Sequence, residues 1–163
     1  LGFALPSFYV RLVTEVANGG FGPGSGLGGV PPTGHFDADM GVSIVEHYLR
    51  ARDDPEDATR QPIRVLPLLS WGCAMYCELD CATDAGRVLF SEGLDEGIGY
   101  WVTSPSLREW MAQWADGTDV EAELLEVVRH EVRTNPFTKE PVRVPIRRPR
   151  GERVDVRVRQ TRA

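Results

Sequence analysis

Residues 107–114 read LREWMAQW, and this stretch predicts the main core helix of the chain. Its large apolar residues recur at the i, i+3, i+4, i+7 spacing of one helix face: Leu107, Trp110, Met111 and Trp114. We expect Ser104 to cap this helix, Pro105 to occupy its first position and Gly117 to follow its end. So large and aromatic a face predicts that the helix lies across a sheet and packs against it.

The residues before this helix supply strands for that sheet. Four segments carry short apolar or alternating patterns: Ile63–Leu69, Ala74–Cys81, Arg87–Ser91 and Tyr100–Thr103. Pro67 interrupts the first segment, which suits an edge strand or a bulge. The turn at 83–86 predicts that the second and third segments pair as an antiparallel hairpin. The predicted fold class is therefore α+β, with a single mixed and largely antiparallel sheet and helices packed around it.

Three further segments predict helices. Ser7–Asn18 is expected to be helical, with a stop at Asn18-Gly19, and Val42–Arg52 is expected to form a short helix. Asp119–Val132 could form another. The residues expected to face inward are, in chain order, Tyr9, Leu12, Val13, Val16, Val45, Tyr48, Leu49, Val120, Leu124, Val127 and Val128. The glycine-rich stretch 19–41 predicts a loop, because glycine loses more backbone entropy on ordering than other residues.

The last 29 residues read as a separate basic extension, so we expect one α+β domain over 1–134 and an extension over 135–163. Valine and isoleucine alternate with polar residues over 142–146 and 154–158, and 148–152 could join the two runs as a hairpin. The alternative is a disordered basic arm. The outer face of the hairpin would carry only arginine: Arg143, Arg147, Arg153, Arg157 and Arg159.

Charge divides the chain in the same way. The 163 residues carry a net charge of −6, with 42% apolar residues and no apolar run long enough to cross a bilayer. Residues 1–134 hold 21 acidic and 9 basic residues, a net of −12, and residues 135–163 hold 3 and 9, a net of +6. An acidic body would repel nucleic acid and attract a basic partner, or would only keep the protein soluble. Nucleic-acid contact is conceivable only for the arginine-rich end, and the oligomeric state stays open.

The three cysteines indicate a reducing compartment. An odd number argues against a disulfide framework, and the chain does not open with the pattern of a secretory signal, so we expect a cytoplasmic protein. Cys73, Cys77 and Cys81 are spaced by four. On a strand they would span roughly 26 Å at ~3.3 Å per residue, too far to share one metal ion. We expect buried free thiols.

No other pattern predicts catalysis, a metal or a cofactor. Gly24, Gly26 and Gly29 match G-x-G-x-x-G, but a helix precedes them and Val30-Pro31-Pro32 follows, whereas a dinucleotide site needs a strand before and a helix after. The histidines, His35, His47 and His130, lie in different predicted elements. Glu78 and Asp80 lie close in sequence, but carboxylates are so abundant here that such a pair is weak evidence for acid–base chemistry.

Several short segments together resemble one known family. They are, in order, residues 1–9 (LGFALPSFY), 18–23 (NGGFGP), 68–73 (LLSWGC), 79–80 (LD), 106–110 (SLREW) and 135–138 (NPFT). In this order and spacing the chain resembles the SUKH superfamily, which includes yeast cell-wall-synthesis regulators and many bacterial proteins. The resemblance covers most of residues 1–140, and the basic end beyond Arg147 departs from the family pattern.

The resemblance implies an α+β fold whose first family helix would precede Leu1, and it carries over no catalytic residues. Bacterial members serve, or are proposed to serve, as immunity proteins that bind a polymorphic toxin. The expected function is therefore a non-enzymatic module that neutralises a basic toxin, such as a nuclease; the alternative is a regulatory or scaffold protein without a toxin. The candidate partner-binding residues are one aromatic and several acidic positions: Phe21, Asp53, Asp54, Glu56, Asp57, Glu78, Asp80, Asp95 and Glu96.

Overall fold

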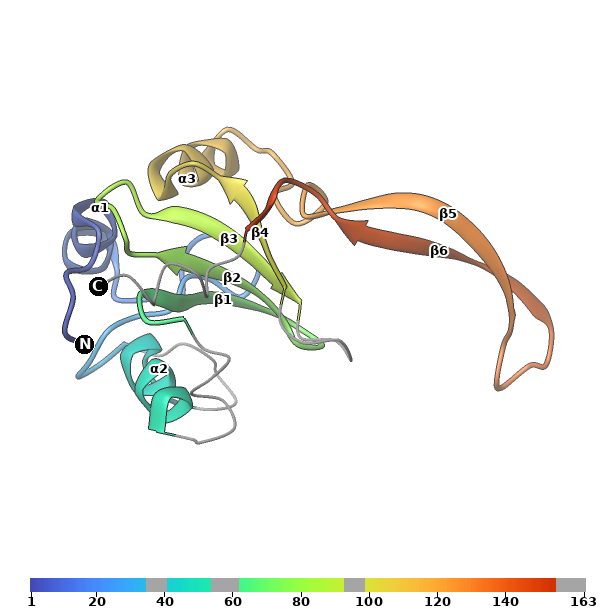
Figure 1. The fold of residues 1–163 in the computed structure, drawn as a ribbon, viewed down its shortest axis with the longest axis horizontal. Helices are drawn as coiled ribbons and strands as arrows, with labels where there is room; N and C mark the ends of the chain where they lie inside the picture. Colours follow the sequence, from blue (N-terminus) through green and yellow to red (C-terminus); the bar gives the residue numbers. More distant parts are fainter. Residues whose placement is uncertain (35–40, 54–61, 93–98, 155–163) are drawn as a thin grey trace.

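The computed structural model describes residues 1–34, 41–53, 62–92 and 99–154. Within them, five antiparallel strands form the main sheet in the order β1-β2-β3-β4-β7 (Figure 1). The strands are β1 (Val65–Gly72), β2 (Met75–Asp80), β3 (Arg87–Glu92), β4 (Gly99–Ser104) and β7 (Arg153–Val154). A separate two-stranded sheet consists of β5 (Leu125–Thr134) and β6 (Pro141–Pro149). The α+β class is confirmed, but the expected single mixed sheet is wrong: there are two sheets, and every described strand pair is antiparallel.

The predicted helices form with shifted ends. The first is α1 (Ser7–Arg11), which continues as a π-helical turn, η1 (Leu12–Val16). It ends two residues before the expected Asn18, because Ala17 has an extended backbone, and Val16 consequently lies exposed. Gly19 has a φ of 96°, as expected after a helix stop. The second helix, α2 (Ile44–Asp53), lies where it was predicted and packs beside β1.

The predicted core helix is α3 (Leu107–Ala115). Leu107, Trp110 and Met111 are buried, but Trp114 is 37% exposed because the helix ends one residue later. The cap also differs from the expectation. Ser106, and not Ser104, caps the helix, since its hydroxyl accepts the Glu109 N–H at 3.2 Å.

Side chains pack on both faces of the main sheet. The larger cluster joins the sheet to the helices, and its fully buried large members include Tyr9, Ile44, Leu66, Leu68, Phe90 and Trp110. A smaller cluster on other strand positions contains Val65, Leu89 and Tyr100. Pro67 lies in β1, the edge strand of this sheet, at an irregularity in its pairing with β2, as predicted.

The helix expected over Asp119–Val132 does not form. Val120 and Leu124 are buried in a turn segment, and from Leu125 onward the chain is strand β5. Val127 and Val128, which were expected to face inward, are exposed. The physical reason is cross-strand pairing: β5 is rich in β-branched residues, which suit a pleated surface, and it pairs along its length with β6.

The C-terminal hairpin also pairs differently from the prediction. β6 pairs with β5, so the expected domain boundary at residue 134 falls at the tip of a hairpin, and the expected partner run 154–158 lies outside the described residues except for Val154. Arg153 and Val154 instead form β7 on the edge of the main sheet, opposite Trp101 and Tyr100. Arg143 and Arg147 lie on β6, whereas Arg153 lies over the Trp101 ring, 5.7 Å from its centre. Arg157 and Arg159 lie outside the described residues.

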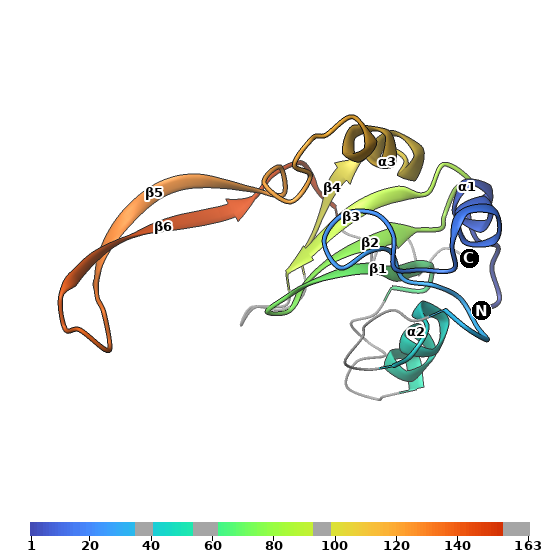
Figure 2. The ribbon, with the colours of Figure 1, turned by 180° about the vertical axis from the view of Figure 1, so that it is seen from behind.

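The two-stranded sheet projects from the body as a long twisted ribbon (Figures 1 and 2). We call residues 125–149 the arm. Its root is closed by a hydrogen bond from the Arg150 N–H to the Leu124 carbonyl, at 2.9 Å.

Across the described ranges, no helix combines the length and apolar character that a membrane span requires.

Candidate functional site

Of the nine residues predicted to bind a partner, the four that the structure describes do not gather at one place. Phe21 is partly buried against the core cluster, and Asp53 is exposed at the end of α2. The remaining acidic positions divide into two buried residues, Glu78 and Asp80, and five that lie outside the described residues: Asp54, Glu56, Asp57, Asp95 and Glu96.

Glu78 and Asp80 are held inside the protein. Both side chains lie on β2, which is covered by β1 and β3 on its two edges, and they are only 5% and 4% exposed. A Glu78 carboxylate oxygen accepts the Ser91 hydroxyl at 2.7 Å. Asp80 accepts the Ala82 N–H at 2.9 Å and pairs with Arg87. These carboxylates therefore organise the sheet and are not presented to a partner.

The glycine-rich stretch is a packed scaffold and not a phosphate loop. The Tyr9 hydroxyl donates to the Gly28 carbonyl at 2.6 Å, and the Gly28 N–H donates to the Leu68 carbonyl at 2.8 Å. Asn18 ties the loop together, because its amide donates to the Val30 carbonyl and accepts the Val30 N–H, each at 2.8 Å. The loop backbone is thus engaged by the protein itself, and no helix begins directly after Gly29.

This scaffold positions Trp71 at the end of β1. Gly24 lies directly against the indole, so that a Cβ at residue 24 would come within 2.7 Å of the ring. The Trp71 indole N–H donates to the Cys77 sulfur at 3.2 Å. Burial raises the pKa of the Cys77 thiol to about 12, which keeps the sulfur protonated beneath the indole at neutral pH. A large, partly exposed aromatic side chain is therefore held in one orientation.

Trp71 lines a hollow where the arm leaves the body. The hollow has a volume of about 580 Å³, and we call it the root hollow. Its apolar lining comes from the sheet and from the arm root: Trp71, Met75, Phe90, Ala122, Leu124, Leu125 and Val127. Its charged lining comprises Asp119, Glu121, Arg147 and Arg150. Aromatic, methionine and arginine side chains are the residue types enriched in protein–protein interfaces.

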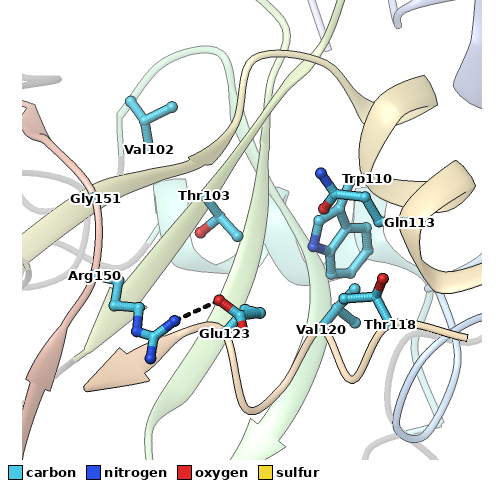
Figure 3. A pocket seen from close by; sticks show the side chains of 9 residues that line it. All are labelled: Val102, Thr103, Trp110, Gln113, Thr118, Val120, Glu123, Arg150 and Gly151. Carbon is cyan, nitrogen blue, oxygen red and sulfur yellow. Dashed lines mark hydrogen bonds and ion pairs between the residues drawn. The ribbon is translucent and has the colours of Figure 1, made fainter. Parts of the chain in front are cut away.

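A second cavity, of about 440 Å³, lies beside the arm root and shares Arg150 with the first (Figure 3). Trp110 lines it and is 1% exposed, and its indole N–H has no hydrogen-bond partner within the described part of the chain. Thr103, Gln113 and Thr118 add polar groups, and the Glu123–Arg150 ion pair lies across the cavity from Trp110. The cavity therefore offers one buried donor and several polar groups to water or to a small polar ligand.

The arm is the functional candidate that sequence reasoning missed. Its strands carry ion pairs from Glu131 to Arg129 and Arg133, and from Glu126 to Arg148. Phe137, at the tip, is 91% exposed. The sequence did contain a strand signal after Val127-Val128: His130, Val132 and Thr134 alternate with charged residues. The pairing of β5 with β6 slips between Val127 and Arg129, and this bulge breaks the period of two that identifies a strand.

The cysteines and histidines do not assemble into a reactive cluster in the described structure. Cys77 and Cys81 are buried free thiols, as predicted, but Cys73 is exposed in the β1–β2 turn, because it lies beyond the end of β1. His47 lies on α2 and His130 on the arm, while His35 falls outside the described residues. Over those residues, no three histidine, cysteine or acidic side chains converge to hold a metal ion.

Comparison with known proteins adds no relative. No family model matches the chain, and neither a curated protein nor a solved structure matches it.

Proposed function

We propose that this chain is a non-enzymatic bacterial immunity protein that binds and neutralises a polymorphic toxin. The family resemblance of residues 1–140 suggests this role. The observation that carries the proposal is the root hollow, which is lined by the fixed Trp71 indole, by apolar side chains of the sheet and the arm, and by four charged side chains. Protein partners use such a site to bury an anchor side chain while the charged residues set orientation.

The charge of the body supports a basic partner. Asp119 and Glu121 line the hollow and are exposed, and within the described part of the chain Glu121 forms no ion pair that would occupy its carboxylate. A nuclease toxin needs a basic cleft to hold phosphate groups, so carboxylates at this position would accelerate encounter and favour the correct partner. Neutralisation then follows from covering the cleft and requires no chemistry from this chain.

The test is binding between the full chain and the toxin domain encoded beside its gene, together with protection when the two are expressed in one cell. We expect Glu121→Arg to weaken binding at least about tenfold and to reduce its sensitivity to salt. Glu15→Arg is the matched control. It makes the same charge change on η1, at the end of the body far from the arm (Figure 1), and should leave affinity unchanged.

The outcomes separate the candidate functions. Failure to bind or protect against any neighbouring toxin contradicts the immunity role. If Glu121→Arg and Glu15→Arg affect binding equally, the root hollow is not the contact site. Capture of a partner that is not a toxin, with the same dependence on Glu121, would favour a regulatory scaffold.

A further inference from the structure

The arm has two strand edges along its length, and they differ chemically. Within the described structure β5 and β6 pair only with each other, so each has one outer edge. The ribbon stands away from the body in both views (Figures 1 and 2). Unpaired edges are templates for another strand, and isolated two-stranded ribbons are only marginally stable in water.

Proline blocks the outer edge of β6. Pro141, Pro145 and Pro149 lie four residues apart in this strand, so their nitrogens point to the same edge. Proline has no N–H to donate, yet all three residues are paired with residues of β5, Pro145 inside the ladder and Pro141 and Pro149 at its two ends. Their nitrogens therefore face outward. An added strand would find no donor at these three positions, which is how natural sheets protect an edge.

The outer edge of β5 has no such protection. Directly opposed residues of antiparallel strands are either both hydrogen-bonded to each other or both turned outward. His130 lies opposite Pro145 and Thr134 lies opposite Pro141, so both residues turn their N–H and carbonyl groups outward. Val132, midway between them, does the same. Three consecutive outward positions are thus open to a further strand.

The charged residues beside this edge would be complementary between two copies of β5. Glu131 and Arg133 flank Val132, so an antiparallel pair of β5 edges centred on Val132 places Glu131 opposite Arg133 of a second copy, twice. Centring on Glu131 instead would oppose two glutamates and bring Arg129 against Arg133. Centring on His130 would run the added ladder into the bulge at Val128.

We propose that the chain pairs with a second copy of itself through the outer edges of β5, antiparallel and centred on Val132. The product is a four-stranded sheet in the order β6-β5-β5-β6, with proline on both outer edges. This inference does not rest on the proposed function, because it is argued from the backbone edge and the charges of β5 and not from the lining of the hollow.

Exposed apolar side chains fit this arrangement. Val132 is 74% exposed, and the pairing brings the two copies of this side chain together at the centre. In the same register Asn135 lies opposite Arg129 of the second copy, so the tip with Phe137 extends toward exposed Val128 and Val127. The overlap runs along most of β5, and because the two strands are antiparallel, the bodies lie at opposite ends of the paired ribbons.

Proline substitution tests the edge. Val132→Pro removes an outward donor from β5 but leaves the hydrogen bonds to β6, whereas Arg143→Pro makes the same change at the opposite residue on the already blocked edge. By sedimentation velocity over a concentration series we expect a dimer for the native chain and for Arg143→Pro, and a monomer for Val132→Pro. Far-ultraviolet circular dichroism of all three chains reports whether the arm remains folded.

Charge reversal tests the register even if the proline variant loses the arm. Glu131→Arg and Arg133→Glu should each weaken dimerisation at least about tenfold, because each opposes like charges twice. An equimolar mixture of the two variants should dimerise again, because each reversed residue then meets an opposite charge. Ion pairs within a single chain are the same in the mixture as in each variant alone, so they cannot account for restored dimerisation.

Three results would overturn the proposal. One is a native chain that sediments as a monomer up to its solubility limit. The second is a dimer that Val132→Pro leaves intact. The third is a mixture of the two charge variants that associates no better than either variant alone, which would exclude the register centred on Val132.

Discussion

Replacing Asn18 by alanine should loosen the glycine-rich loop that supports Trp71. The Asn18 amide donates to the Val30 carbonyl at 2.8 Å and to the Thr33 hydroxyl at 3.1 Å, and it accepts the Val30 N–H at 2.8 Å. Each such bond stabilises the folded state by about 1 kcal/mol net, and more where a backbone group is left without a partner. The bond to Thr33 is exposed and counts least, so the expected loss is about 2–3 kcal/mol.

The measurement is urea unfolding followed by circular dichroism, extrapolated linearly to water. For a chain of this length the loss corresponds to a fall in Tm of about 4–12 °C. Thr33→Ala removes only the exposed bond and should stay within about 0.5 kcal/mol of the native chain. An Asn18→Ala variant equally close to the native chain would refute the view that Asn18 organises the loop.

Three other expectations concern backbone crowding and the thiols. Gly26→Ala should destabilise the fold by at least about 1 kcal/mol more than Gly117→Ala in urea unfolding, because both residues have positive φ but only at residue 26 would a Cβ meet backbone, at 2.5 Å. In the native protein at pH 8, a maleimide should modify Cys73 at once and Cys77 or Cys81 only on unfolding, which mass spectrometry reads directly; equal rates would contradict the burial. Burial raises the pKa of the Cys77 thiol from 9.0 to about 12. The free energy of unfolding should therefore be highest below pH 9 and fall as the pH rises toward 12. A Cys77→Ala variant should show a smaller fall over that range.

The local residue pattern was sufficient to predict a helix or strand that buries one of its faces. The spacing of Leu107, Trp110 and Met111 predicted α3 because a helix on a sheet must present a continuous apolar stripe. The strands over 63–103 were predicted for the same reason, with Pro67 correctly assigned to an edge. The cap was misplaced by two residues, since Ser104 and Ser106 are both plausible capping residues and only hydrogen-bond geometry distinguishes them.

Pattern failed where distant residues decide the outcome. Leu124, Val127 and Val128 fit a helical stripe, and the choice of a strand came from β6, which supplies a partner for every residue around the bulge. The candidate acidic residues show the same limit. Nothing local in Glu78 or Asp80 distinguishes a surface carboxylate from one enclosed by neighbouring strands.

The sequence by itself determined the α+β class, the core helix, the main strands and the uneven charge, because each of these follows from residue spacing or composition within one segment. Only the tertiary structure decided which strands pair, which carboxylates reach solvent and where Trp71 and the arm root form a hollow. These depend on contacts between residues tens of positions apart, whose free energy exists only once the chain has closed the loops between them.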